Sequence, residues 1–284
     1  MRIVAFALVM LLTSAARADL QFFPTSSVIV ANLWRKKPRV VAFGEYHEIQ
    51  GQVSGGAKVP SAVKRFGDEM LASLAADSSD LVLETWVTEG KCGETETKAV
   101  AKVEESIKRP ETTEDELVTL LKRAKSAGVQ PHILTLSCAE YQDIQPKDGE
   151  IDYVKLLGVV TAQLKKGIDA ALDKAPKRKT VVVYGGALHN DLFPKKELAQ
   201  FSFAKAVKKL VGGRYLEVDL YVPEYVEKDK EIAAQPWFHA WRKQQAAHPG
   251  QPALVERGAS SYIVIFPITS IPTDPAAAVK QPQH

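Results

Sequence analysis

The sequence predicts a single α/β domain with a mostly parallel sheet, helices on both faces and right-handed crossovers. Three observations predict it. Short apolar runs recur along the chain and end at glycine or polar residues, as buried strands of a parallel sheet do. Amphipathic segments with helical spacing alternate with these runs. No internal repeat and no long linker interrupts the alternation over the 284 residues, so we expect one domain over residues 19–272.

The first eighteen residues predict a secretory signal peptide. Arg2 precedes the apolar run Ile3–Leu12, and Ala16-Arg17-Ala18 forms a small-x-small cleavage site. The run is too short to span a bilayer as a mature helix. The alternative is an N-terminal core strand. We expect cleavage after Ala18 and a periplasmic or secreted protein with no transmembrane segment.

Charge and composition are those of an ordinary globular protein. Cleavage would remove Arg2 and Arg17 and no acidic residue, which lowers the formal net charge from +3 to about +1. No basic stripe with interleaved aromatic residues is present, so the sequence does not predict nucleic-acid binding.

Six strands are expected from the apolar runs. Their ranges are Val40–Phe43, Leu81–Glu84, Val129–Leu136, Thr180–Tyr184, Arg214–Val222 and Tyr262–Pro267. The segment Arg214–Val222 alternates, with Leu216, Val218 and Leu220 on one face. Residues 21–33 are mixed and are assigned to an edge segment.

Five helices are expected between these strands. Their ranges are Ser61–Ala75, 113–128, Tyr153–Lys174, Phe203–Leu210 and Trp237–Ala246. The first has apolar residues at helical spacing, and the second begins with a capping-box pattern at Thr113 and Glu116 and ends at Gly128. Residues 88–110 depart from the α/β rhythm and are assigned to a lid or a short inserted helix. Residues 273–284, rich in Pro, Ala and Gln, predict a disordered tail.

Two Gly-x-x-His steps follow expected strands. The first is Gly44-Glu45-Tyr46-His47, and the second is Gly186-Ala187-Leu188-His189. A third strand ends at Glu84. Because ligand sites of open α/β sheets lie beyond the carboxyl ends of the strands, we expect Glu45, His47, Glu84 and His189 to converge there.

Two carboxylates and two imidazoles can hold a metal ion or perform general acid–base chemistry on water. Tyr46 and Trp86 flank this site and could stack a planar ligand, although wall packing is their default interpretation. A single Gly-x-x-His step has little specificity, and a Glu–His pair at a strand end is most often a solvated or hydrogen-bonded polar pair. The occurrence of three such strand ends in one chain favours a site.

In this order, the motifs resemble those of the Tiki superfamily. The Gly-Glu-x-His form is most similar to the ChaN-like branch of haem-binding uptake proteins, and erythromycin esterases are more distant. The resemblance covers the core from about Arg39 to Tyr221 and implies that Glu45, His47, Glu84 and His189 are the site residues. The chain departs from the branch at Glu48, where Asp is usual, and its signal lacks a lipid-bearing cysteine.

Haem binding is therefore implied by the resemblance alone, since no Cys-x-x-Cys-His haem signature is present. The first hypothesis is an exported protein that binds haem or a related ligand. The alternative is a metal-dependent hydrolase of peptide or ester bonds, or a metal-free variant in which Glu84 orients His47 as the base. A structural remnant with a satisfied polar cluster is the third. The residues leave open whether the protein is an enzyme, whether its cofactor is haem or a divalent metal, and whether its ligand is a small molecule or a peptide.

The two cysteines predict a disulfide. Cys92 and Cys138 each follow an expected strand, and an exported protein meets an oxidising compartment. The bond would close a loop of about 45 residues and stabilise the fold by about 3–4 kcal/mol. The alternative is a nucleophilic cysteine beside His189.

Overall fold

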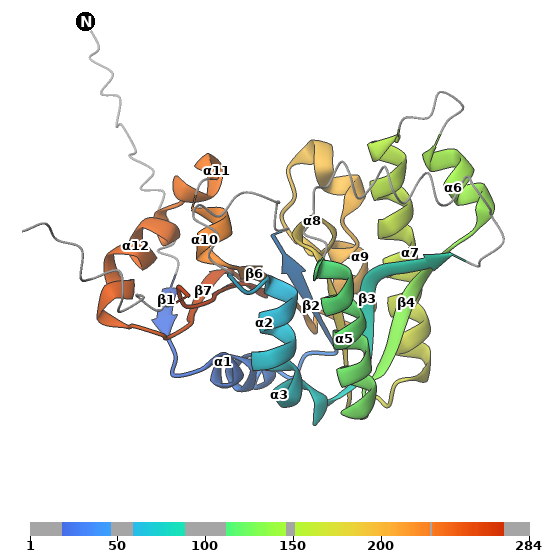
Figure 1. Ribbon diagram of the computed structural model, residues 1–284. Coiled ribbons are helices and arrows are strands. Elements are labelled where there is room, and N and C mark those ends of the chain that lie inside the picture. Colours follow the sequence, from blue (N-terminus) through green and yellow to red (C-terminus); the bar gives the residue numbers. More distant parts are fainter. Residues whose placement is uncertain (1–18, 47–58, 89–111, 146–150, 228, 270–284) are drawn as a thin grey trace, which may run out of the picture.

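Residues 19–46, 59–88, 112–145, 151–227 and 229–269 are described by the computed structural model shown in Figure 1, although side chains 86–88 and 112–115 are not. One eight-stranded sheet runs through the molecule in the order β1-β7-β8-β6-β2-β5-β3-β4. Its strands are β1 (Asp19–Phe22), β2 (Val40–Glu45), β3 (Ser78–Thr88), β4 (Gln130–Leu136), β5 (Thr180–Gly186), β6 (Tyr215–Tyr221), β7 (Ala253–Gly258) and β8 (Ser261–Ile265).

The sheet is mixed, which corrects the expectation of a mostly parallel one. β7 pairs antiparallel with both β1 and β8, whereas the pairs between β8, β6, β2, β5, β3 and β4 are parallel. The expected strands omitted β7. A short turn with Ser260 at a φ of 74° joins it to β8, and such a connection can only produce an antiparallel pair.

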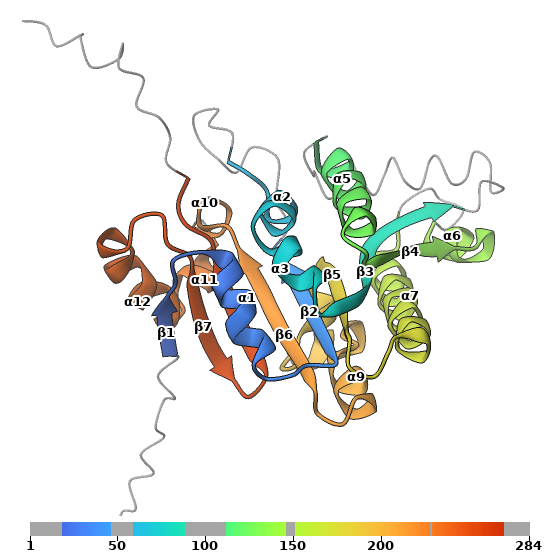
Figure 2. The ribbon, with the colours of Figure 1, turned by 90° about the horizontal axis from the view of Figure 1, so that it is seen from below.

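Helices cover both faces of the sheet (Figure 2). One face carries α1 (Ser26–Trp34), α2 (Ala62–Arg65), α3 (Leu71–Ala75) and α5 (Thr112–Ser126). The other carries α6 (Cys138–Ile144), α7 (Tyr153–Lys174), α9 (Ala204–Leu210), α11 (Lys230–Ala233) and α12 (Pro236–Gln244). Two four-residue helices, α8 (Ala187–Asn190) and α10 (Pro223–Val226), follow β5 and β6 directly. Short 3-10 turns span Lys196–Phe201 and Gln245–Ala247.

Two expected segments take a more detailed form. The helix expected over Ser61–Ala75 is divided into α2 and α3 by a π-helical turn at Phe66–Met70. The mixed segment 21–33 contains the end of edge strand β1 and most of helix α1. No helix in the described part of the chain is long and apolar enough to cross a membrane.

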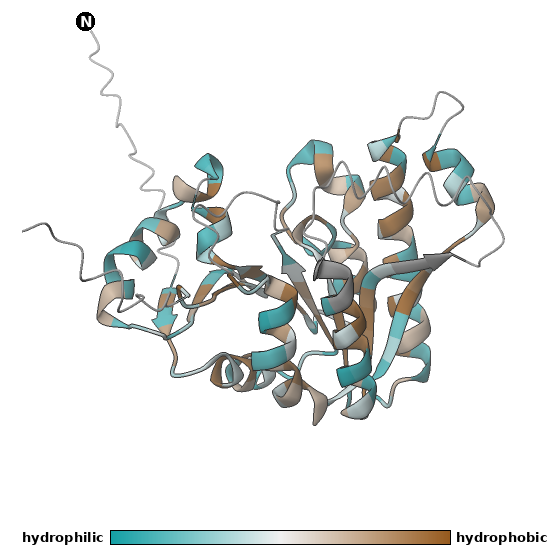
Figure 3. Ribbon diagram, in the orientation of Figure 1, coloured by the Kyte–Doolittle hydropathy of each residue, from teal (hydrophilic) through white to brown (hydrophobic). Residues whose placement is uncertain are grey.

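The core consists of three apolar clusters. Figure 3 shows brown, hydrophobic stretches along the strands and along the helices that cover them. The first cluster lies between the sheet and the helices α1, α2, α3 and α5, which together form the α1–α5 face. The second lies under α6, α7 and α9, and the third lies under α11 and α12. Along β6, Tyr215 belongs to the second cluster and Tyr221 to the third. Because alternate residues of a strand share a face, the intervening Glu217 and Asp219 separate these two clusters with buried charge.

Candidate functional site

The three strand ends singled out in the sequence are neighbours in the sheet. β5 lies between β2 and β3, with Glu45 opposite Gly186 and Leu83 opposite Tyr184. Since all three strands are parallel, their carboxyl ends lie along one edge of the sheet. The second Gly-x-x-His step, which follows β5, therefore lies between the end of β2, which carries Glu45, and the end of β3, which carries Glu84.

A bulge in β3 places Glu84. Leu83 pairs with Ile133 and Trp86 pairs with Leu134, so Glu84 and Thr85 are two extra residues on β3. Figure 1 shows the bend of β3 beyond this region. Bulges re-aim side chains and are common next to active sites. Here the backbone N–H of Gly186 donates to Glu84 Oε2 at 2.6 Å.

Gly185 makes room for that carboxylate. A Cβ atom at this position would lie 2.5 Å from Glu84 Oε2 and 2.9 Å from Glu84 Cβ. Gly44 has a corresponding role on β2, where a Cβ would lie 2.6 Å from Ala187 Cα and from the Asn190 amide. Gly44 therefore lets α8 pack against β2, and Gly185 lets Glu84 lie against β5.

His189 lies on α8 and is 4% exposed. Its Nδ1 is 2.8 Å from Thr161 Oγ1 and 3.1 Å from the carbonyl oxygen of Phe201. A carbonyl oxygen only accepts, so we assign the proton to Nδ1 on this contact. In the neutral imidazole the lone pair is then on Nε2, which lies 3.8 Å from Glu84 Oε1.

The pair formed by Glu84 and His189 has a specific chemical consequence. Two acceptors face each other at a distance longer than a direct hydrogen bond. The pair is complementary to an added proton, to a water that donates to both atoms, or to a cation. Both side chains are at least nine-tenths buried, so the electrostatic interaction is weakly screened.

Glu45 lies in a different environment. Its Oε2 accepts a hydrogen bond from the Tyr184 hydroxyl, and that tyrosine belongs to the apolar cluster under α1–α5. Burial raises the pKa of the nearby Glu116 carboxyl, and the charge of Glu45 acts in the same direction. Ser61 donates to Glu116. His189, by contrast, contacts Thr161 of α7, which lies on the opposite face of the sheet.

The remaining predicted residues lie apart from the pair or outside the description. His47 and Cys92 lie outside the described residues, as does the side chain of Trp86. Tyr46 donates to Asp229 and packs edge-on against Tyr221, with ring centroids 5.9 Å apart, and burial raises the pKa of Tyr46. Tyr46 is thus partly buried and packs against the third apolar cluster.

The sulfur and metal predictions have different outcomes. Cys138 is disulfide-bonded, and no free cysteine occurs among the described residues. The Cys92–Cys138 pairing stays a prediction because Cys92 is not described. Within the described ranges, no three His, Cys, Asp or Glu side chains form a group that could hold a metal ion.

The sequence interpretation missed two polar features. Thr161 occupies a helical position with no signal that separates it from other helix residues. Glu217 and Asp219 had a usable signal, since they alternate with Leu216, Val218 and Leu220 on one strand. In a sheet covered on both faces, the face opposite an apolar row is also buried, so two acids there predict a buried charge cluster.

No family model matches the chain, and no curated protein matches it. Among solved structures, the chain is similar to the type III effector HopBA1, with 12% identity, a TM-score of 0.41, and coverage of 90% of this chain and 100% of that chain. It is also similar to RRSP, a MARTX toxin effector domain from Vibrio vulnificus CMCP6, with 13% identity, a TM-score of 0.28, and coverage of 59% and 34%. Likeness at these scores carries no inference about function.

Proposed function

We propose that this protein is a hydrolase that activates water between Glu84 and His189. The observation that carries the proposal is the buried acceptor pair, His189 Nε2 and Glu84 Oε1, at 3.8 Å. A water molecule that donates one hydrogen to each atom would have its oxygen lone pairs directed away from both. That oxygen is then available to attack a carbonyl carbon.

Glu84 and His189 have different roles in this reaction. Glu84 accepts the proton from water as the new O–C bond forms, while His189 holds the second hydrogen and orients the nucleophile. The proton then passes to the leaving amine or alcohol as the bond to the carbonyl carbon breaks. Gly186 N–H, bound to Glu84 Oε2, and the Thr161–Phe201 contacts of Nδ1 keep both groups in place.

The same donor set fits a divalent cation, which is the metal-dependent form of this hydrolase. An imidazole nitrogen and a carboxylate oxygen are typical zinc ligands. A metal-bound histidine usually donates its other N–H to a carbonyl or carboxylate, as Nδ1 of His189 does to Phe201. His189 and Glu84 would hold the ion, and His47 is the proposed third ligand. A bound cation would lower the pKa of its water.

The test compares hydrolysis of p-nitrophenyl acetate and a fluorogenic peptide by the full chain and by His189→Gln and Glu84→Gln. We expect each variant to lose about 10²–10⁴-fold in kcat/KM. Glu227→Gln, which breaks an exposed ion pair with Arg242, is the matched control and should keep full activity. Equal activity of the wild type and both site variants would overturn the proposal.

A chelator decides between the two forms. Activity that is lost in EDTA and restored by Zn²⁺, Mn²⁺ or Co²⁺ supports the metal-dependent form, and elemental analysis of gently purified protein should then find a stoichiometric metal. Activity that resists the chelator supports proton transfer by Glu84 and His189 alone. Absence of metal, together with inactivity after each ion is added, would overturn both.

Haem binding is the second candidate function. It is supported by the Nδ1 contact of His189, since an axial histidine donates its Nδ1–H to an acceptor such as the Phe201 carbonyl and binds iron through Nε2. Haem titrated into the protein should produce a saturable Soret shift that His189→Gln abolishes. No shift at micromolar haem, or a shift unchanged in His189→Gln, would rule out this site.

Membership of the Tiki superfamily, in its ChaN-like branch, and export are also part of the proposal. The first is supported by the order of the three motifs, together with the adjacency of their strands. Export is supported by the N-terminal pattern. N-terminal sequencing of protein from a periplasmic or secreted fraction should read Asp19 first, and an intact Met1 would contradict export.

A further inference from the structure

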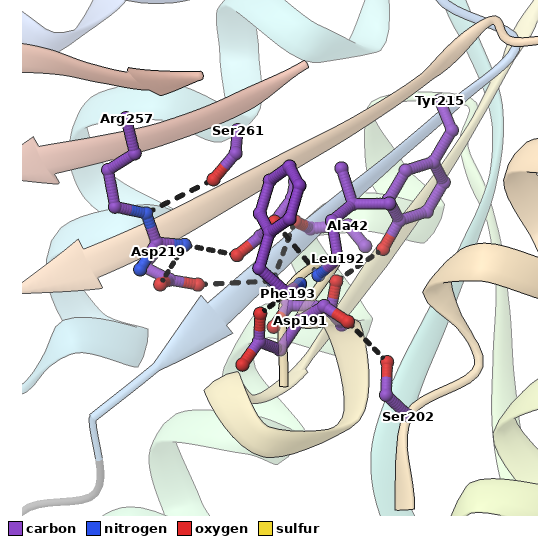
Figure 4. Close-up of polar contacts among 11 residues, drawn as sticks. Ala42, Asp191, Leu192, Phe193, Ser202, Tyr215, Asp219, Arg257 and Ser261 are labelled. Atoms are coloured by element: carbon purple, nitrogen blue, oxygen red, sulfur yellow. Dashed lines mark hydrogen bonds and ion pairs between the residues drawn. The ribbon is translucent and has the colours of Figure 1, made fainter. Parts of the chain in front are cut away.

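Two buried carboxylates beside the proposed site take no part in the chemistry described above. Glu217 and Asp219 are 0% and 4% exposed and lie on the same face of β6. Arg257 of β7 binds both, with a distance of 2.8 Å to Asp219 Oδ2, and its Nε donates to Ser261 Oγ at 3.1 Å (Figure 4). One arginine thus serves two acids.

The same acids and their neighbours bind the chain segment that follows His189. Glu217 Oε2 accepts from the Leu192 N–H at 3.0 Å. The Asn190 amide donates to the carbonyl of Ala42 at 3.1 Å and to Asp219 Oδ1 at 3.4 Å. From the other side, the Tyr215 hydroxyl donates to the carbonyl of Asn190 at 2.9 Å. Figure 4 labels Tyr215, Ala42 and Asp219 around this segment.

Helix α8 needs such support. It has four residues and no side-chain hydrogen bond at its N-cap, Gly186. A helix this short has little stability of its own, so tertiary contacts determine where it lies. Asn190 is the last residue of α8 and directly follows His189, which means that its contacts set the end of the helix nearest the imidazole.

Burial of the Asn190 side chain is partly unfavourable, because one of its polar atoms is left without a hydrogen bond within the described part of the chain. Its Oδ1 is buried and has no hydrogen-bond partner among the described residues. An unpaired buried acceptor is unfavourable. The two bonds made by its Nδ2, one to β2 and one to β6, are the compensating interaction that holds α8 on both strands.

We propose that Asn190, Glu217 and Asp219 are positioning residues that fix α8 against β2 and β6 so that His189 Nε2 faces Glu84. That these residues assist hydrolysis rests on the proposed function, whereas their effect on the position of the His189 imidazole does not. The proposal is therefore tested by a readout of the ring itself.

The experiment is NMR of the full chain with ¹⁵N-labelled histidine, in which the His189 signal is identified by its loss in His189→Gln. The wild type should show the Nδ1–H tautomer with a slowly exchanging proton. Asn190→Ala and Glu217→Gln should mix the tautomers and speed exchange of that proton about tenfold, because α8 opens more often. Thr161→Val removes a direct contact of Nδ1 and is the positive reference.

Two further variants serve as controls, one remote from His189 and one that makes a smaller change beside it. Glu227→Gln breaks an exposed Arg–Glu pair and should leave the His189 signal unchanged. Tyr215→Phe removes only the hydroxyl bound to Asn190 and serves if the stronger variants do not fold; it should shift the signal in the same direction by a smaller amount. Folded variants with a wild-type tautomer and exchange rate would overturn the proposal. An altered ring signal in a chain without hydrolase activity would retain the positioning role and remove only the proposed function.

Discussion

Gly185 is the residue on which the position of Glu84 depends most directly. The missing side chain leaves the space that the carboxylate fills, since a Cβ would lie 2.5 Å from Oε2 and 2.9 Å from Glu84 Cβ. Real Cβ atoms do not approach other heavy atoms so closely, and both neighbours belong to a buried side chain on a bulged strand. Either Glu84 or β5 must move when a methyl group is added.

We therefore expect Gly185→Ala to destabilise the protein by about 1–3 kcal/mol, the usual cost of overpacking. Urea denaturation followed by circular dichroism measures the change. Gly158→Ala is the matched control, because a Cβ there meets nothing within 4 Å and the position is inside α7. In that helix alanine should be neutral or stabilise by about 0.5–1 kcal/mol. Equal stability of the two variants would contradict the close approach at Gly185.

At the scale of elements, a buried arginine joins the start of β2 to the end of α7. The Arg39 guanidinium donates to the carbonyls of Leu172, Ala175, Pro176 and Lys179, and the side chain is buried. Three of the carbonyls belong to the last turn of α7 or directly follow it, where helices leave acceptors unpaired. The planar guanidinium donates to all four carbonyls from its two terminal nitrogens, whereas an ammonium has only three N–H donors, all on one atom.

Arg39→Lys should therefore destabilise the protein by about 2–4 kcal/mol, because charged hydrogen bonds to buried carbonyls are lost. Thermal and urea unfolding measure this change. Arg178→Lys, an exposed substitution in the same connection, should be within about 0.5 kcal/mol of the wild type. A loss at Arg39 no larger than that at Arg178 would show that the guanidinium contacts add nothing.

The elements that the sequence predicted well are those whose signals are local. The helix Tyr153–Lys174 is confirmed at both ends, because Asp152 caps its start and Pro176 follows its end. Strand β7 was missed because Ala253–Gly258 ends in a polar stretch that lacks a regular alternation. Its order in the sheet depends on the pairing with β1 and β8, which is non-local information.

At the candidate site, too, some features follow from the local sequence and others depend on non-local contacts. Strand ends and topology were enough to bring Glu84 and His189 together, since parallel strands align their carboxyl ends. The hydrogen bond between Tyr184 and Glu45 could not be predicted. The Tyr184 hydroxyl reaches the carboxylate from the adjacent strand on the α1–α5 face. Likewise the bulge at Glu84 and Thr85 depends on the register with β4, which no local pattern encodes.

At the scale of the whole molecule, the disulfide is a constraint on the unfolded chain. Cys138 is disulfide-bonded, and Cys92 is the other cysteine in the sequence. Denatured, unreduced protein should contain no free thiol. Reduction, or the double variant Cys92→Ser and Cys138→Ser, should lower the free energy of unfolding by about 3–4 kcal/mol, because a long loop is released in the unfolded state. Two titratable thiols in the unreduced protein would contradict the bond.

The pH dependence of stability is the second whole-molecule property, and it has its source in β6. Burial raises the pKa of Glu217 to about 7 and that of Asp219 to about 6, from ordinary values of 4.5 and 3.8, although Arg257 acts in the opposite direction. Each acid therefore holds its proton more tightly in the folded state than in the unfolded chain. This contribution to stability is complete below the unfolded pKa values and is lost as the pH rises through the folded ones.

The wild type should consequently lose part of its free energy of unfolding as the pH rises from about 4 to about 7. The double variant Glu217→Gln and Asp219→Asn should lack that part of the slope, even if its stability is lower at every pH because Arg257 has lost both partners. Urea titrations at half-unit pH intervals measure the difference between the two proteins, which cancels the titration of other groups. Glu227→Gln should keep the wild-type slope. A wild-type curve parallel to that of the double variant would mean that both carboxyls have their ordinary pKa values in the folded state, because the charge of Arg257 then offsets the effect of burial.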